Sequence, residues 1–534
     1  MPNAAPPKPP GERPGTASGR AGPLTRRLGS TTYVSKAADV QRPPAPPWSP
    51  PAVPDRRSRR TLWLALAAGL VVLVALAAGA LFVLRPAGLF GSTATASPSA
   101  KAPPVPPPSP VLGPAPSDAP IPTADAVAAA LHGPLTDQRL GGHVGVQVAD
   151  VATGQSLYAQ NAGDPVVPAS TMKLVTAVTA LAVRGPAYQI QTRAVAGPNP
   201  GEVVLVGGGD PTLSVDGNGS YPGAARLDDL AAQVKKALGG VAPTRVLVDS
   251  SLFTGPTTGP NWEPGVVDGF GYTARVVPLM LDGGRTNPKQ LDNPSPRTST
   301  PDVAAGQALA RLLGLSSSAV ATGRAPAGSG SAPSNGSSAN PGAPAPGTQL
   351  GAVSSAPLVR ILEEMMRTSD NTIAELVARQ VALAGNQPAT FAGVGTAVQA
   401  QLTDLGLPTG GVRVADGSGL SLDDRVSAQL LTAILTLAAR ADRPALHALF
   451  TGLPVAGYSG TLATRYRGPN GNPADGVLRA KTGTLTGVNG LAGYVVDAKG
   501  RLLSFAVLAD RVTAGTLPAE AALDRIGTAL ANVA

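Results

Sequence analysis

The chain has 534 residues, with 64 Gly, 56 Pro and only 3% aromatic residues, so part of its length is expected to lie outside any packed core. It contains no cysteine, which excludes disulfides, thiolate zinc sites and a cysteine nucleophile. The formal net charge is +9, but residues 1–60 hold 11 Lys or Arg against 3 Asp or Glu. The remaining chain is therefore near neutral, which disfavours nucleic-acid binding.

The first 122 residues predict three segments. Residues 1–60 include 14 Pro and show no apolar periodicity, which indicates a disordered tail. Residues 61–84 carry no charge and would span about 36 Å as a helix, enough to cross a bilayer. Arg56, Arg57, Arg59 and Arg60 precede this span and only Arg85 follows closely, so we expect a cytoplasmic N-terminus. Residues 85–122, rich in Pro, Ser and Ala, are expected to be a linker.

These segments predict a single-pass protein of the cell membrane whose folded part is extracytoplasmic. A cleaved signal peptide is the alternative, because Ala94-Thr95-Ala96 resembles a small-residue cleavage site. The length of the apolar span and of the tail before it favours a retained anchor.

Folded sequence begins near Thr123, with a helix predicted to Leu131 and a strand predicted over His143–Val148. Near the other end, Gly490–Val496 and Leu502–Leu508 are expected to be strands, followed by a helix over Pro518–Ala531. Strands from both ends with helices between them predict an α/β fold in which the termini meet in one antiparallel sheet.

Three short motifs follow one another along the chain: Ser170-Thr171-Met172-Lys173, Ser369-Asp370-Asn371 and Lys481-Thr482-Gly483. The chain has nine lysines, and two of them lie in these motifs. Ser338-Ala339-Asn340 also matches the middle pattern, but it lies in a run of Gly, Ser, Ala, Pro and Asn that cannot hold a catalytic side chain rigidly. Together the motifs spell the active site of a penicillin-recognising serine enzyme.

In the first motif, a helix would place Ser170 and Lys173 on one face within hydrogen-bond reach. Ser170 is the expected nucleophile and Lys173 the general base, its pKa lowered by burial and by Lys481. Ser170 is expected in the first helical turn, where free N–H groups favour a developing anion.

The second motif lies between helices predicted over 358–366 and 373–383. We expect Ser369 to point at Lys173 as a proton relay and Asn371 to offer its amide to a substrate. Capping of the second helix by Ser369 or Asp370 is compatible with this role.

The third motif is expected on an inner strand lining the cleft. Lys481 and Thr482 suit a terminal carboxylate of the substrate. Gly483 would let the substrate approach the backbone, and the Thr484 N–H could complete an oxyanion hole.

The two serines Ser170 and Ser369 are 369 − 170 = 199 residues apart, more than one helical subdomain needs. We therefore assign residues 190–349 to one or two inserted domains that end in a flexible Gly/Ser/Pro linker. The catalytic domain then comprises residues 123–189 and 350–534.

Other catalytic machinery is poorly supported. His132, His143 and His447 show no metal-type spacing, and no Gly-x-Ser-x-Gly elbow occurs. Neither a metal nor a cofactor is expected.

Beyond the three motifs, residues 123–534 resemble the D-alanyl-D-alanine carboxypeptidase/endopeptidases, the class C low-molecular-mass penicillin-binding proteins. The resemblance extends to Gly207-Gly208, Asp210-Pro211-Thr212-Leu213, Trp262, Asp282-Gly283, Asp416-Gly417-Ser418-Gly419-Leu420-Ser421 and Leu453-Pro454-Val455-Ala456-Gly457. It implies a serine β-lactamase/DD-peptidase-like transpeptidase fold, with an antiparallel sheet flanked by helices, a helical subdomain and an insert.

The same resemblance implies acyl transfer on peptidoglycan stem peptides through an acyl-enzyme on Ser170, with β-lactam antibiotics as covalent inhibitors. Two alternatives stay open. One is a β-lactamase or esterase of the same fold, against which the long insert argues. The other is an inactive cell-wall-binding scaffold, against which the intact motifs argue.

Overall fold

The computed structural model describes residues 119–291, 294–327, 344–468 and 471–534. The predicted tail, the predicted transmembrane helix and residues 85–118 of the predicted linker lie outside these ranges. Across the described ranges, no helix is both long enough and apolar enough to cross a membrane.

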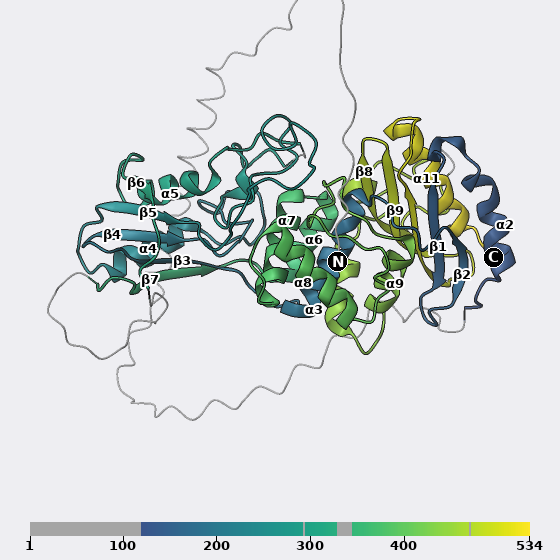
Figure 1. Cartoon of the computed structure of the whole chain (residues 1–534), viewed down its shortest axis with the longest axis horizontal. Coiled ribbons are helices and arrows are strands. Elements are labelled where there is room, and N and C mark those ends of the chain that lie inside the picture. The colour runs from purple at the N-terminus through teal and green to yellow at the C-terminus, as the bar shows by residue number, and fades with distance from the viewer. Residues whose placement is uncertain (1–118, 292–293, 328–343, 469–470) are drawn as a thin grey trace, which may run out of the picture. The chain divides into compact units, whose positions relative to one another are not determined.

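A five-stranded antiparallel sheet joins the two ends of the described chain (Figure 1). Its strands, in spatial order, are β2 (Ser156–Gln160), β1 (Val144–Asp150), β10 (Leu502–Ala509), β9 (Val488–Val496) and β8 (Leu478–Leu485). Because β1 pairs with β10, the prediction that early and late strands meet in one antiparallel sheet is confirmed.

Helices cover both faces of this sheet. Leu503, Phe505 and Val507 of β10 pack in one cluster with α2 (Ala124–Leu135) and α11 (Thr516–Ala531). The alternate residues Ala506 and Leu508 belong to a second cluster, which contains α9 (Ala428–Ala438). The period-2 alternation of the strand thus separates two apolar cores.

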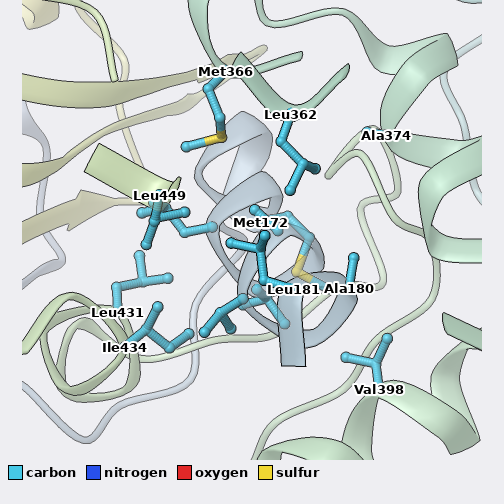
Figure 2. Close-up of a cluster of buried hydrophobic side chains, with 14 of the residues drawn as sticks. Met172, Ala180, Leu181, Leu362, Met366, Ala374, Val398, Leu431, Ile434 and Leu449 are labelled. Atoms are coloured by element: carbon cyan, nitrogen blue, oxygen red, sulfur yellow. The ribbon is translucent and has the colours of Figure 1, made fainter. Parts of the chain in front are cut away.

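The second core is a helical subdomain built around α3 (Met172–Arg184). Every residue from Met172 to Leu181 is buried, so this helix is enclosed on all sides. Figure 2 shows apolar side chains of the surrounding helices gathered about it. Those helices are α6 (Leu358–Thr368), α7 (Asn371–Ala384), α8 (Phe391–Asp404), α9 and α10 (Ala448–Gly452).

A second five-stranded sheet lies between the first and second motifs. Its order is β6 (Val320–Thr322), β5 (Arg245–Asp249), β4 (Glu202–Val206), β3 (Gln191–Ala196) and β7 (Gln349–Ser354). The predicted end of the insert, residue 349, is the first residue of β7. Because β7 belongs to the second sheet, the inserted segment extends to Ser354. We call residues 190–354 the inserted domain.

Two helices, α4 (Leu227–Ala237) and α5 (Pro301–Leu312), share an apolar core with this second sheet. The connection from β5 to α5 is long, and among its described residues the one helical element is a short 3-10 turn at Asp282–Gly284. This connection contacts the helical subdomain, for example where Trp262 Nε1 donates to the Asp416 carboxylate at 2.7 Å.

Candidate active site

Ser170 lies in a 3-10 turn (Ala169–Thr171) that leads directly into α3. It therefore lies just before the α-helix, whereas we expected it in the first α-helical turn. Lys173 Nζ is 3.0 Å from Ser170 Oγ. The same amine donates to Asn371 Oδ1 at 2.6 Å and to the Ser418 carbonyl at 2.8 Å. Two fixed acceptors therefore aim the Lys173 amine at the hydroxyl of Ser170.

Ser369 and Asp370 form the tight turn between α6 and α7. Ser369 has a left-handed backbone with φ of 59°, and the Asp370 carboxylate caps α7 by accepting from the Ile373 N–H at 3.1 Å. The Ser369 hydroxyl accepts from Lys481 Nζ at 2.9 Å. We expected this hydroxyl to point at Lys173; the structure pairs it with the lysine of the third motif instead.

Asn371 bridges the first motif and the inserted domain. Its Oδ1 accepts from Lys173, and its Nδ2 donates to the Tyr272 carbonyl at 3.0 Å. Asn371 also lines the cavity described below. Both ends of the amide that we expected to face a substrate are thus engaged within the protein.

The third motif lies on β8, which is an edge strand of the first sheet and not the inner strand we expected. The Ala480 N–H donates to the Pro454 carbonyl, on the side away from β9. Because N–H groups alternate in direction along a strand, those of Thr482 and Thr484 point to the same open side. An edge position is what leaves these groups free to meet a ligand.

Gly483 has a role in packing besides the one expected toward a substrate. A Cβ at this position would lie 2.7 Å from the Pro168 carbonyl and 3.1 Å from the Thr171 side chain. The missing side chain therefore lets the turn that carries Ser170 lie against β8.

A cavity of about 700 Å³ opens over these motifs. The third motif lines it with Thr482 and Thr484, and the Thr482 hydroxyl is 2.8 Å from that of Thr461. The inserted domain and the C-terminal part of the chain complete its walls. The lining residues include Ser170, Ser369, Asn371, Thr461, Thr482, Thr484, Glu263, Phe270, Tyr272, Leu420, Arg465 and Glu520.

Burial dominates the electrostatics of the two lysines. Loss of water lowers the pKa of Lys173 to about 8, although the carboxylates of Asp416, Glu375, Asp370 and Asp424 oppose this shift. Burial also lowers the pKa of Lys481, and the charge of Lys173 lowers it further. We expected burial and Lys481 together to lower the pKa of Lys173, and burial is the largest cause.

The chain is similar to several known proteins. The sequence profile of the D-Ala-D-Ala carboxypeptidase 3 (S13) family matches residues 127–324 and 333–530. A carboxypeptidase of Mycobacterium tuberculosis is 43% identical over 399 residues, covering 73% of this chain and 81% of that protein. The carboxypeptidase DacB of Mycolicibacterium smegmatis is 40% identical over 461 residues, covering 85% and 94% of the two chains. This chain belongs to the S13 family.

The fold of this S13 protein is similar to that of penicillin-binding protein 4 from Haemophilus influenzae. The TM-score is 0.59 at 23% identity, over 75% of this chain and 97% of that one. At this level of identity the likeness concerns the fold, a mixed α/β architecture with an antiparallel sheet and a helical subdomain.

The loop Asp416–Ser421 supports Lys173 in this S13 chain. The buried Asp416 carboxylate accepts from the backbone N–H groups of Ser418, Gly419 and Ser421 at 2.9, 2.6 and 2.7 Å. These bonds hold the Ser418 carbonyl where Lys173 donates to it. The sequence pointed to this loop only through the family resemblance.

Glu375 was missed by the sequence reasoning. Its carboxylate lies fully buried in α7 and accepts from the N–H groups of Gly417 and Ser418 at 3.1 and 2.9 Å. Burial, followed by the charge of Asp416, raises the pKa of Glu375 to about 7. The sequence did carry a signal, because Glu375 is flanked by the apolar residues 373–374 and 376–378, and an acidic side chain in such a stretch is costly to bury unless it has a specific partner.

Proposed function

We propose that this protein is a membrane-anchored serine D-Ala-D-Ala carboxypeptidase and endopeptidase that acts on peptidoglycan stem peptides. The observation that carries the proposal is the pairing of Ser170 Oγ with the buried amine of Lys173 at 3.0 Å. A second serine–lysine pair, Ser369 with Lys481, lies beside the same cavity. This arrangement can activate a serine without histidine or metal.

In the proposed reaction, Ser170 Oγ attacks the carbonyl carbon of the penultimate D-Ala while Lys173 accepts the hydroxyl proton. The N–H groups of Ser170 and Thr484 stabilise the oxyanion. The intermediate collapses by breaking the C–N bond, and the proton that Lys173 accepted passes to the leaving nitrogen, with Ser369 and Lys481 as the proposed relay, so D-Ala leaves as an amine and Lys173 is neutral again. Water then attacks the acyl carbon while Lys173 takes one of its protons and passes it to Ser170 Oγ, and the acyl group leaves as the carboxylic acid.

Carboxypeptidase and endopeptidase activity are the same chemistry with different leaving groups. If the amine belongs to a neighbouring stem peptide, the step that releases D-Ala cuts a crosslink instead. A β-lactam presents its strained amide to the same serine, so it acts as a covalent inhibitor. Lys481 and Thr482 are the groups proposed to receive the carboxylate of either ligand.

The localisation that we propose rests on sequence. Residues 61–84 are uncharged and follow four arginines within residues 56–60, which favours a single span with the N-terminus in the cytoplasm. The catalytic domain then faces the peptidoglycan, and residues 85–122 serve as a spacer between the bilayer and that domain.

The test is incubation of the purified full-length chain with muropeptides, followed by mass spectrometry. We expect pentapeptides to lose one D-Ala and crosslinked dimers to be split, each in wild-type protein and neither in Ser170→Ala. Products that persist in Ser170→Ala would refute the proposal. Intact muropeptides together with fast turnover of penicillin would favour a β-lactamase.

A further inference from the structure

We infer that the inserted domain positions the second motif for catalysis, and that Arg285 and Tyr221 are the positioning residues through which it acts. The inference rests on the proposed function, because it concerns the rate of acyl transfer to Ser170. It concerns side chains that touch neither substrate nor Ser170.

The turn that carries the second motif needs external support. Ser369 adopts a left-handed backbone conformation, which is strained for a non-glycine residue. Its hydroxyl nevertheless has to meet Lys481, and Asn371, two positions later, has to meet Lys173. Both contacts depend on the geometry of Asp370, the residue between them.

Asp370 is held from both sides. Its Oδ1 accepts from the Ile373 N–H of α7, and its Oδ2 accepts from Arg285 Nη2 and from the Tyr221 hydroxyl, each at 2.9 Å. The Arg285 and Asp370 side chains are only 3% and 1% exposed, so the ion pair is shielded from solvent. Removing one partner of a pair buried this deeply leaves the other charge buried and unpaired.

Two arginines keep the buried Asp370 carboxylate ionised. Burial opposes ionisation of Asp370, but the positive charges of Arg297 and Arg285 outweigh it and lower the pKa of Asp370 to about 2. Burial raises the pKa of the Tyr221 phenol, so its hydroxyl keeps the proton that it donates. Asp370 is therefore an anion at every pH at which the protein would work.

Tight turns in the inserted domain place the side chains of Arg285 and Tyr221 beside Asp370. Asp282 precedes Gly283 and Gly284, and all three have positive φ, so Arg285 follows a tight left-handed turn. A Cβ on Gly283 would lie 2.6 Å from the Tyr221 hydroxyl and 3.0 Å from Arg285 Nη1. The Asp282 carboxylate also accepts from the N–H of Ser220, the residue before Tyr221.

The inserted domain makes two further hydrogen bonds to the residues that follow Asp370. The Tyr272 carbonyl accepts from Asn371 Nδ2 at 3.0 Å, and the Ala274 N–H donates to Thr372 Oγ1 at 3.0 Å. Three consecutive residues from Asp370 are thus each bonded to the inserted domain. The inserted domain therefore contacts the second motif at Asp370 and Asn371 and at Thr372, the residue that follows it.

The test compares Arg285→Gln with Arg226→Gln in the full-length chain. Arg226 lies in the same inserted domain, but its ion pair with Asp228 is partly exposed, so its loss controls for removal of one arginine. A fluorescent penicillin reports both the acylation rate and the fraction of molecules labelled at completion. We expect Arg285→Gln to acylate about 10- to 100-fold more slowly than wild type, and Arg226→Gln within about twofold of wild type.

The fraction labelled separates positioning from simple stabilisation. If Arg285 only stabilised the fold, fewer molecules would be labelled but each would react at the wild-type rate, and the inference would be wrong. Should Arg285→Gln fail to fold, Tyr221→Phe removes a single hydroxyl and is expected to slow acylation in the same direction by a smaller factor; an unchanged rate would also overturn the inference. Wild-type protein that is never labelled contradicts the proposed function instead.

Discussion

Lys173→Met is expected to slow acylation of Ser170 by about a hundredfold to ten-thousandfold, the usual contribution of a general base. Met is unbranched and similar in length to Lys, so it fills the buried site without leaving a cavity. It removes the need to bury an amine but leaves Asn371 Oδ1 and the Ser418 carbonyl without their donor, so the two effects oppose each other and thermal stability should change little. Stopped-flow acylation by a chromogenic penicillin, together with a thermal melt, measures both quantities.

The pH dependence of the wild type serves as the control for this substitution. The neutral amine is the base, and the pKa of Lys173 is lowered to about 8. The acylation rate should therefore rise about tenfold per pH unit below 8 and level off above it. This limb should be absent in Lys173→Met. A rate loss below tenfold, or a limb that survives the substitution, would show that another group is the base.

Asp416→Ala is expected to destabilise the protein by about 3 kcal/mol or more and to slow acylation as well. The substitution removes four hydrogen bonds and leaves the N–H donors of Gly419, Ser421 and Trp262 without this acceptor, whereas the Ser418 N–H keeps its bond to Glu375. The net loss should be smaller than the sum over four bonds, because removing this charge relieves its repulsion of Glu375 and Asp424. Urea unfolding with and without the substitution gives the free-energy difference.

Asp423→Ala is the matched control for Asp416→Ala. Asp423 lies two residues beyond the loop Asp416–Ser421, its side chain is 33% exposed and its ion pair with Arg413 is long, at 3.7 Å. Its loss should change the free energy of unfolding by less than about 1 kcal/mol. If Asp416→Ala lowered the free energy of unfolding by no more than Asp423→Ala does, the protein would tolerate loss of the Asp416 hydrogen bonds.

Regular elements could be predicted from the sequence because their side-chain periodicity is local. The predicted strand over Leu502–Leu508 is β10 (Leu502–Ala509), and the predicted helix over Pro518–Ala531 is α11 (Thr516–Ala531). The order of the three motifs likewise sufficed to bring Ser170, Asn371 and Lys481 to one site. In these cases the pattern along the chain and the packing in space require the same residues to be buried.

The partner of Ser369 could not be predicted in this way. Its left-handed backbone directs the hydroxyl to Lys481, and the spacing of residues in a motif carries no information about φ. The edge position of β8 was missed for a related reason. β8 is buried by Pro454 and by the turn that carries Ser170 as well as by β9, so burial along this strand does not reveal that it lies at the edge of the sheet.

The contacts between the inserted domain and the second motif could not be predicted from the sequence either. Arg285 and Asp370 are 85 positions apart, and neither lies in a periodic pattern that points at the other. Each residue alone is an ordinary surface charge by composition. Only the turn at Asp282–Gly284 and the capping of α7 bring them together.

The most direct test of the account is to identify the residue that carries the acyl group. After reaction of the full-length chain with a penicillin, peptide mass spectrometry should locate a single covalent adduct on Ser170, and Ser170→Ala should carry none. An adduct on Ser369, or no adduct while D-Ala is still released, would contradict the assignment of Ser170 as the nucleophile activated by Lys173.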